Sequence, residues 1–380
     1  GWVIRSVIRH LDLNGFKPFR DWDRYPLTAV FSARGCTMNC AICGGSCSAM
    51  RSVFCRKRPA YRSPELLALD VYNIYCHLKS PIFIVGDLRQ GGKDYPERFF
   101  NEVKKLGVEN HIVLEIFTPA QNEFFSMASK SLGSYSVQFS PDSQDEKVRY
   151  ALGRCFDNAS LESTVLKSFK HGCKRFDLFF MIGLPQQTLA SVFAIADYID
   201  HFYRTIESAE KEKLFFYASP LAPFLDPGSQ AFENPEVYGY RLFARTLEDH
   251  RVRLLNPSWK DVLSYETIWM TRSEIVRSSY DVAERINARR FESGLISREA
   301  YESLVDRITL ARKLDAKIES IMLIRDMQER RNQLQSLRDE VRALMESTIC
   351  KKRDLEWEAE GILRSVPRAL FGILKGKKMR

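Results

Sequence analysis

Residues 34–46 read RGCTMNCAICGGS, and the short apolar run LTAVF precedes them at residues 27–31. The apolar run is typical of a buried strand, so the cysteines lie on the loop that follows it. The CxxxCxxC spacing lets the thiolates of Cys36, Cys40 and Cys43 bind one soft metal centre. Three thiolates satisfy only three irons of a four-iron cluster, so one iron stays open to another ligand. The pattern therefore predicts a reactive metal centre rather than a closed one.

A zinc site is the main alternative for these cysteines. Structural zinc takes four ligands, and Cys47 or Cys55 is available as the fourth. Isolated buried thiols are also common in proteins, although such tight spacing favours shared metal binding. The residues leave two classes open. One is an enzyme with an open metal position, and the other is a non-enzymatic zinc or iron–sulfur module whose C-terminal helices dock a partner.

The composition is that of a globular chain, with 380 residues, 45% of them hydrophobic and 28% charged. The net charge of +9 permits weak attraction to anionic partners, but there is no clear aromatic–basic signature of nucleic-acid binding. No apolar stretch is long enough for a membrane span, and we find no signal peptide. We therefore expect a cytoplasmic protein with free or metal-bound thiols. The chain opens on Gly1 rather than Met, which is consistent with a missing upstream segment.

Strand-like and helix-like patterns alternate after the cysteine loop. Further apolar runs predict strands at residues 81–85, 112–117, 135–139, 176–182 and 214–217. The segments between them have apolar residues at helical spacing, as in the helix that Ser63 and Pro64 begin and in the helix that Asn158 caps. This alternation predicts an α/β fold with a parallel sheet, an open, partial (β/α)6 barrel. Sites in such sheets lie at the carboxyl ends of the strands, which is where the cysteine loop is expected.

Four regions are expected along the chain. Residues 1–24 are a lead-in, which fits the end of a missing upstream domain. Residues 25–240 form the partial barrel, residues 241–300 a barrel-associated segment, and residues 301–380 a helical extension with a basic tail. Apolar residues recur in the extension at irregular heptad spacing, which favours helices packed on the barrel over a coiled-coil dimer.

The cysteine loop resembles that of the radical S-adenosylmethionine (SAM) superfamily in its spacing, its preceding strand and Ile42 before the third cysteine. The resemblance implies a 4Fe-4S cluster held by Cys36, Cys40 and Cys43, with SAM bound to the open iron through its amino and carboxylate groups. One electron from the cluster then cleaves SAM to methionine and a 5′-deoxyadenosyl radical. A reductant such as flavodoxin or ferredoxin is the implied partner, and Ile42 is expected in the cofactor site.

Polar residues at later strand ends match positions at which superfamily members bind SAM. Gly86 and Asp87 stand where relatives have a Gly-Gly-Glu-like turn, so Asp87 is expected to accept a hydrogen bond from the SAM amino group. Ser140 and Arg154 are expected to contact the ribose and the carboxylate of SAM. Arg154 suits a bidentate contact with a carboxylate, and an ordinary surface arginine is the alternative.

The fifth strand supplies the expected adenine contact. Its segment FFMIGLP at residues 179–185 resembles the superfamily's Gly-x-Ile-x-Gly segment, with Phe179 in place of the first glycine. Met181 takes the apolar position, and Gly183 allows the backbone to approach a ligand closely. The same residues fit a strand-to-helix turn that Thr188 caps.

Three acids are the candidates for substrate chemistry. Glu115 lies inside an apolar strand, where an unpaired carboxylate is costly, so we expect it to face a polar cavity or a cation. Asp226 and Glu266 lie in segments that resemble a subgroup of radical SAM proteins usually fused to an N-terminal cobalamin-binding domain. Either acid fits a turn or a helix cap equally well.

That subgroup makes cobalamin a candidate cofactor, for methylation of an unknown substrate. The usual lower-ligand signature Asp-x-His-x-x-Gly is absent from the sequence, and residues 1–24 are too short for a cobalamin domain. We therefore expect a fragment, a cobalamin-free enzyme, or a cofactor held by a separate chain. The sequence identifies neither the substrate nor the reaction.

Overall fold

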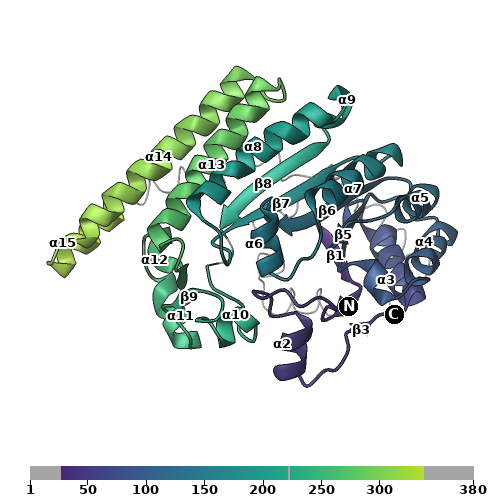
Figure 1. Cartoon of the computed structure of the whole chain (residues 1–380), viewed down its shortest axis with the longest axis horizontal. Coiled ribbons are helices and arrows are strands. Elements are labelled where there is room, and N and C mark those ends of the chain that lie inside the picture. The colour runs from purple at the N-terminus through teal and green to yellow at the C-terminus, as the bar shows by residue number, and fades with distance from the viewer. Residues whose placement is uncertain (1–26, 221–222, 338–380) are drawn as a thin grey trace.

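Six parallel strands form the central sheet of the computed structural model, which describes residues 27–220 and 223–337 (Figure 1). The strands are β1 (Thr28–Phe31), β4 (Ile82–Val85), β5 (Ile112–Ile116), β6 (Tyr135–Asp142), β7 (Phe176–Ile182) and β8 (Leu214–Pro220). They lie side by side in this order, and every pairing is parallel. Because β1 and β8 lie at opposite edges, the described strands do not close into a ring. The expected α/β partial barrel is therefore confirmed.

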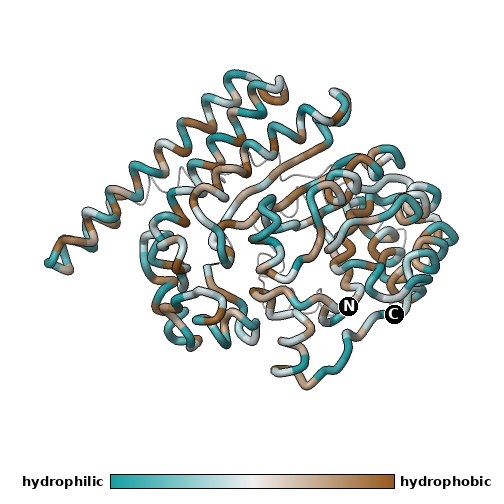
Figure 2. The backbone as a smooth tube through the Cα atoms, in the orientation of Figure 1, coloured by the Kyte–Doolittle hydropathy of each residue, from teal (hydrophilic) through white to brown (hydrophobic). Residues whose placement is uncertain are grey.

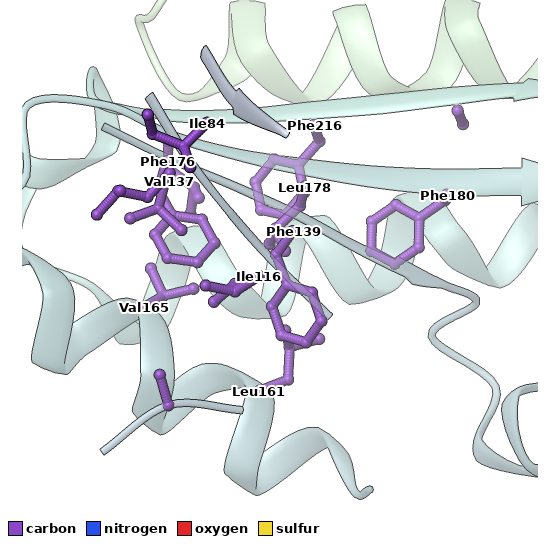
Figure 3. Close-up of a cluster of buried hydrophobic side chains, with 14 of the residues drawn as sticks. Ile84, Ile116, Val137, Phe139, Leu161, Val165, Phe176, Leu178, Phe180 and Phe216 are labelled. Carbon is purple, nitrogen blue, oxygen red and sulfur yellow. The ribbon is translucent and has the colours of Figure 1, made fainter. Parts of the chain in front are cut away.

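Helices cover one face of this sheet. They are α3 (Pro64–His77), α4 (Tyr95–Lys105), α5 (Asn122–Ser131), α7 (Asn158–Lys170) and α8 (Leu189–Thr205). Alternate strand residues are almost completely buried beneath them, because both sides of this layer are apolar. Figure 3 shows Ile116 and Phe139 of the sheet close to Leu161 and Val165 of α7. This packing fixes where each strand ends, and so where the loops after the strands lie.

The opposite, inner face of the sheet carries polar and aromatic side chains. Glu115 of β5 lies beside Gln138 of β6, which in turn lies beside Asp177 of β7. Gln138 Nε2 donates a hydrogen bond to Asp177 Oδ2 at 3.3 Å. Farther along the same face, Ser140 and Met181 are half-buried. A sheet that presents such residues on one face can contact a polar ligand there.

The helix starts follow the sequence closely. Ser63 Oγ accepts a hydrogen bond from the Leu66 amide, and Thr188 Oγ1 accepts one from the Ser191 amide, so both predicted caps are confirmed. The prediction that Asn158 caps α7 is wrong. Asp157 is the cap and accepts from the Ser160 amide at 2.8 Å, because a carboxylate one residue earlier reaches the free amides of the first turn.

Short elements surround the sheet, and the sequence did not reveal them. They are β2 (Ala33–Arg34), α2 (Cys47–Ser52), β3 (Ala60–Tyr61), η2 (Leu88–Gly91), α6 (Glu146–Ala151), α9 (Ser208–Lys211), α10 (Gln230–Glu233), β9 (Tyr240–Leu242), α11 (Leu247–Leu254), α12 (Trp259–Val262) and β10 (Tyr265–Thr267). Two antiparallel pairs, β2 with β3 and β9 with β10, lie outside the main sheet.

The C-terminal part of the described chain contains α13 (Arg272–Glu292), α14 (Arg298–Met322) and α15 (Met327–Ser336). Helix α13 packs on α8 and β8, whereas α14 packs on α13 and extends away from the sheet (Figure 1). A small second apolar cluster joins the end of α14 to Leu337. The predicted lead-in, residues 1–24, and most of the predicted basic extension lie outside the described residues. No helix among the described residues is long and apolar enough to cross a membrane.

Candidate functional site

The cysteine loop connects β2 to α2 and lies at the carboxyl end of β1. Backbone hydrogen bonds hold it to two separate parts of the chain, and a third closes the loop on itself. The Ala41 amide donates to the Leu152 carbonyl after α6, and the Ala231 amide of α10 donates to the Ala41 carbonyl, both at 2.9 Å. The Cys47 amide closes the loop by donating to the Met38 carbonyl at 2.8 Å. These hydrogen bonds fix the path of the loop relative to α6 and α10.

One glycine allows the loop to approach α6 this closely. Gly153 has a φ of +93°, and a Cβ atom there would lie 3.0 Å from the Asn39 carbonyl oxygen. Any side chain would therefore be strained in its backbone conformation and would press on the cysteine loop. Arg154, one of the predicted SAM ligands, directly follows this contact, so Gly153 brings Arg154 next to the cysteines.

The three thiols differ in their surroundings. Cys36 Sγ accepts a hydrogen bond from the Met38 amide and Cys43 Sγ from the Gly45 amide, each at 3.3 Å, and both residues are half-buried. Cys40 is buried, and burial raises the pKa of its thiol to about 11. Burial also raises the pKa of Cys43. Thiolates must form before these sulfurs bind a metal, so metal binding at this loop releases protons.

The donor set fits an iron–sulfur cluster. The three cysteines of this loop are close enough for the charge of one to raise the pKa of another. The Met38 and Gly45 amides donate hydrogen bonds to two of the sulfurs, as amides do in iron–sulfur sites. Among residues 27–220 and 223–337, no three His, Cys, Asp or Glu side chains converge on a point that holds a single metal ion. A four-iron cluster binds each thiolate through a different iron, so its ligands need not converge in that way.

Gln90 is an unpredicted member of the site. It lies in η2, after β4, and its Oε1 accepts a hydrogen bond from the Thr37 amide at 3.3 Å. Cys36 Sγ lies 3.3 Å from both this oxygen, to which a thiol can donate, and Nε2 of Gln90. A metal-bound thiolate has no proton to donate, so in that state Gln90 is the donor and the sulfur is the acceptor. The turn after β4 is thereby connected directly to the first cysteine.

A buried ion pair borders the cysteines. Arg154 Nε pairs with Asp142 Oδ2 at the end of β6, and the two side chains are only 11% and 2% exposed. Arg154 Nη1 also donates to the Phe117 carbonyl after β5 at 3.0 Å. Burial lowers the pKa of Arg154, but the negative charges of Asp142 and the three cysteines outweigh it and raise the pKa above its usual value. The structure thus brings Arg154 and the cysteines together, while its role as a SAM ligand stays a prediction.

Asp142 has an unusual backbone conformation for its residue type, with a φ of +68° beside a bulge between β6 and β7. Its Oδ1 is buried and has no hydrogen-bond partner among the described residues. Strained backbone of this kind is concentrated at functional sites. The sequence did not single out this residue, because an Asp at the end of a strand resembles an ordinary turn residue.

Asp226 anchors the cysteine loop. Its Oδ2 accepts a hydrogen bond from the Gly44 amide at 2.9 Å, across 182 residues of sequence. A Cβ atom at Gly44 would lie 2.9 Å from Asp226 Cβ, so the two segments are in close contact. The carboxylate was predicted to serve the substrate, and that role stays a prediction. The geometry instead shows it holding the loop beside Cys43.

The turn after β4 places Gly86, Asp87 and Glu115 together. The Gly86 amide donates to Glu115 Oε2 at 2.6 Å, and Gly86 has a φ of +98°. Burial raises the pKa of Glu115, and the hydrogen bond from the Gly86 amide offsets part of this rise because it stabilises the carboxylate. Asp87 is buried and already has several donors, because Arg89 pairs with it and the Phe117 amide donates to its Oδ2 at 3.0 Å. Asp87 therefore closes this turn, and its predicted contact with SAM is untested.

The turn after β7 is built around Gln187, a fully buried side chain that the sequence did not single out. Its Oε1 accepts from the Gly183 amide at 2.8 Å, and its Nε2 donates to the Met181 carbonyl at 2.9 Å. Gly183 has a φ of +93°, and a Cβ atom there would lie 3.3 Å from Tyr265 and Ile275. The described contacts of Gly183 are therefore with other parts of the chain, and the adenine contact remains a prediction.

The remaining predicted residues lie in three places, namely the cysteine loop, strand β6 and the β9–β10 pair. Ile42 is buried in the main core. Ser140 is half-buried on the inner face of β6. Glu266 lies on the small β9–β10 pair, where it accepts from the first amide of α13, that of Arg272, at 3.3 Å and pairs with Arg241. These contacts give Glu266 a position at a helix start, as the sequence allowed, and leave its catalytic role untested.

Comparison with known proteins gave structural matches only. No protein-family model matches the chain, and no curated protein sequence matches it. The known structures that resemble it include radical SAM enzymes. The methyltransferase TsrM from Kitasatospora setae, with cobalamin and a [4Fe-4S] cluster bound, is 12% identical over 73% of this chain and 52% of its own, with a TM-score of 0.48. Cobalamin-dependent OxsB, with aqua-cobalamin bound, is 9% identical over 91% of this chain and 54% of its own, with a TM-score of 0.43.

A third match is coproporphyrinogen III oxidase (HemN) from Escherichia coli, 11% identical over 77% of this chain and 83% of its own, with a TM-score of 0.35. The chain spans about half the length of the TsrM and OxsB structures given above. At these low identities and scores, the chemistry of this chain has to be argued from its own site.

Proposed function

We propose that this chain is a radical SAM enzyme. In this proposal Cys36, Cys40 and Cys43 hold a 4Fe-4S cluster, and the enzyme cleaves SAM reductively to act on a substrate that is not yet known. The observation that carries the proposal is the placement of three thiols on one anchored loop at the carboxyl end of a parallel sheet. Binding sites in open parallel sheets lie at this end.

The surrounding residues support the same reading. The bound cluster would supply one electron to SAM at its open iron. Gln90 and Asp226 hold the loop near its two ends, through hydrogen bonds from the Thr37 and Gly44 amides. Arg154 holds a positive charge near the sulfurs, which favours the thiolate forms of Cys40 and Cys43 and is suited to a carboxylate ligand. A methyl-transfer reaction and a role for cobalamin stay predictions from the sequence.

Anaerobic reconstitution tests the proposal. We expect the protein to hold about four irons and, with dithionite and SAM, to form 5′-deoxyadenosine. Cys36→Ala, Cys40→Ala and Cys43→Ala should each lose the iron and the product. Cys47→Ala is the matched control, since Cys47 is a half-buried cysteine in the following helix, and it should retain both. Stoichiometric zinc that requires Cys47 would contradict the proposal and favour the binding-module alternative.

A further inference from the structure

A strongly basic segment follows the cysteine loop. Between Cys43 and Glu65 the sequence has no acidic residue and contains the cations Arg51, Arg56, Lys57, Arg58 and Arg62. Arg62 pairs with Asp70, whereas the other four are exposed and have no acidic partner among the described residues. Figure 2 shows the stretch between α2 and β3 as hydrophilic after a short hydrophobic tip. We call these four cations together with the exposed Arg34 the basic surface.

A cleft of about 910 Å³ opens beside this surface, between the edge strand β1 and the β2–β3 pair. Arg34, Arg56 and Arg62 line it. Three large apolar side chains lie in the same segments and are more than half exposed, namely Phe31, Val53 and Phe54. Exposed aromatic anchors among arginines are typical of protein–protein interfaces.

The cleft is close to the first cysteine. Arg34 precedes Cys36 by two residues, and Tyr61 lines the cleft. Burial raises the pKa of Tyr61, and the charges of Cys36 and Asp87 raise it further, so this ring lies within electrostatic reach of the cysteine. A protein docked in the cleft therefore lies near the metal-binding end of the sheet.

We propose that the basic surface docks an acidic one-electron carrier protein. The inference rests on the proposed function, because reductive cleavage of SAM consumes one electron. A basic surface attracts an acidic protein and raises the rate at which the two associate. This rate falls steeply as the salt concentration rises. The transfer is balanced: the reduced carrier loses one electron, the cluster gains it, and no atom is exchanged.

The test compares two charge-reversal variants of equal net charge. One is the triple variant Arg56→Glu, Lys57→Glu, Arg58→Glu, whose side chains are exposed. The matched control is Lys104→Glu, Lys130→Glu, Lys170→Glu, which changes exposed lysines in the last turns of α4, α5 and α7. These helix ends lie at the opposite end of the sheet, because the helices run antiparallel to the strands. Circular dichroism checks that both variants are folded.

Two probes are measured with each variant. The rate of cluster reduction is followed by stopped-flow absorbance, with reduced flavodoxin of net negative charge and separately with dithionite. Binding of oxidised flavodoxin is followed by its flavin fluorescence, which needs no cluster in this chain. We expect wild-type protein to bind flavodoxin more weakly as salt rises. The Arg56 triple variant should lose at least tenfold in binding and in reduction rate by flavodoxin, with the dithionite rate unchanged.

Three outcomes would overturn the proposal. In the first, the Arg56 triple variant binds flavodoxin as well as wild-type protein does. In the second, the lysine control loses as much binding, which would mean that only net charge matters. In the third, wild-type protein binds RNA oligonucleotides in a salt-dependent manner, the Arg56 triple variant loses this, and flavodoxin binding does not change. Failure of the proposed function is seen separately, as absence of iron or of 5′-deoxyadenosine with dithionite.

Discussion

Gln90 connects the first cysteine to the turn after β4 through two atoms of one side chain. Its oxygen accepts from the Thr37 amide and lies 3.3 Å from Cys36 Sγ, and its nitrogen lies equally close to the same sulfur. Hydrogen bonds to sulfur are among the factors that set the reduction potential of an iron–sulfur cluster. If the proposed cluster is bound, Gln90 is placed to tune its potential through Cys36 without being a ligand.

We predict that Gln90→Glu makes the cluster harder to reduce. The carboxylate can still accept from Thr37, but it cannot donate to Cys36 and adds negative charge beside it. The midpoint potential, measured by an anaerobic redox titration with EPR detection, should fall by an amount on the order of 59 mV, the value of a tenfold change in a one-electron equilibrium. Gln121→Glu, which adds the same charge beside Lys167, is the control and should leave the potential unchanged. An unchanged potential in Gln90→Glu would contradict the prediction.

Asp226 allows loop anchoring to be distinguished from acid–base chemistry. Asp226→Asn keeps an oxygen that accepts from the Gly44 amide but removes the charge and the proton-accepting ability. If the residue anchors the loop, this variant retains iron and 5′-deoxyadenosine formation, whereas Asp226→Leu loses iron because the Gly44 amide is left without its partner. Iron content and product are the measurements. Loss of 5′-deoxyadenosine formation in Asp226→Asn, with iron retained, would instead support the catalytic role predicted from the sequence.

At the scale of elements, the turn from β7 to α8 depends on one buried amide. Gln187 has contacts with the Gly183 and Leu184 amides and with the Met181 carbonyl, so it closes the turn against the end of its own strand. This turn also supports the small β9–β10 pair, because the Tyr240 hydroxyl donates to the Gly183 carbonyl at 2.9 Å. The local sequence Gly-Leu-Pro predicts a turn, but not the side chain that stabilises it.

We predict that Gln187→Leu lowers the free energy of unfolding by about 3 kcal/mol, since three buried backbone groups lose their partner. Urea unfolding followed by circular dichroism measures the change. Gln186→Gly is the neighbouring control: Gln186 is exposed with a φ of +63°, so glycine relieves strain and should not destabilise the protein. A Gln187→Leu variant as stable as the wild type would mean that water replaces the lost contacts.

At the scale of the whole molecule, the candidate site and a half-buried histidine lie at opposite ends of the parallel sheet. The cysteine loop lies at the carboxyl end of the strands, whereas His111 lies at the amino end of β5. There its Nδ1 and Nε2 lie 2.7 and 2.8 Å from the hydroxyls of Ser134 and Ser136. Burial lowers the pKa of His111 to about 4, and the charges of Arg175 and Lys174 contribute to the shift.

This shift predicts a pH dependence of stability. The ordinary pKa of histidine is about 6.5, so between that pH and about 4 the unfolded chain binds a proton that the folded protein does not. The contribution of His111 to the free energy of unfolding therefore falls as the pH falls through this window. Urea unfolding of cluster-free protein at several pH values should show a smaller loss of stability in His111→Asn than in wild type. Equal slopes for the two proteins would contradict the prediction.

Much of the fold was predictable because it depends on local patterns. Apolar runs and helical spacing located the six strands and the main helices, and Ser63 and Thr188 cap helices as predicted. The prediction for Asn158 was wrong by one residue, because neighbouring Asp and Asn have similar capping preferences. Short elements such as α2 and the β9–β10 pair have too few residues to show a period.

The sequence by itself determined the parallel sheet, the position of the cysteine loop after the first strand, and the thiols available to a metal, because all three follow from the order and spacing of neighbouring residues. Only the tertiary structure brought Gln90, Arg154 and Asp226 to that loop. They lie 54 residues beyond Cys36, 114 beyond Cys40 and 182 beyond Gly44 in the sequence. These partners come from separate strand ends that meet only when the sheet has formed. Spacing along the chain carries no information about such contacts, so packing alone decided them.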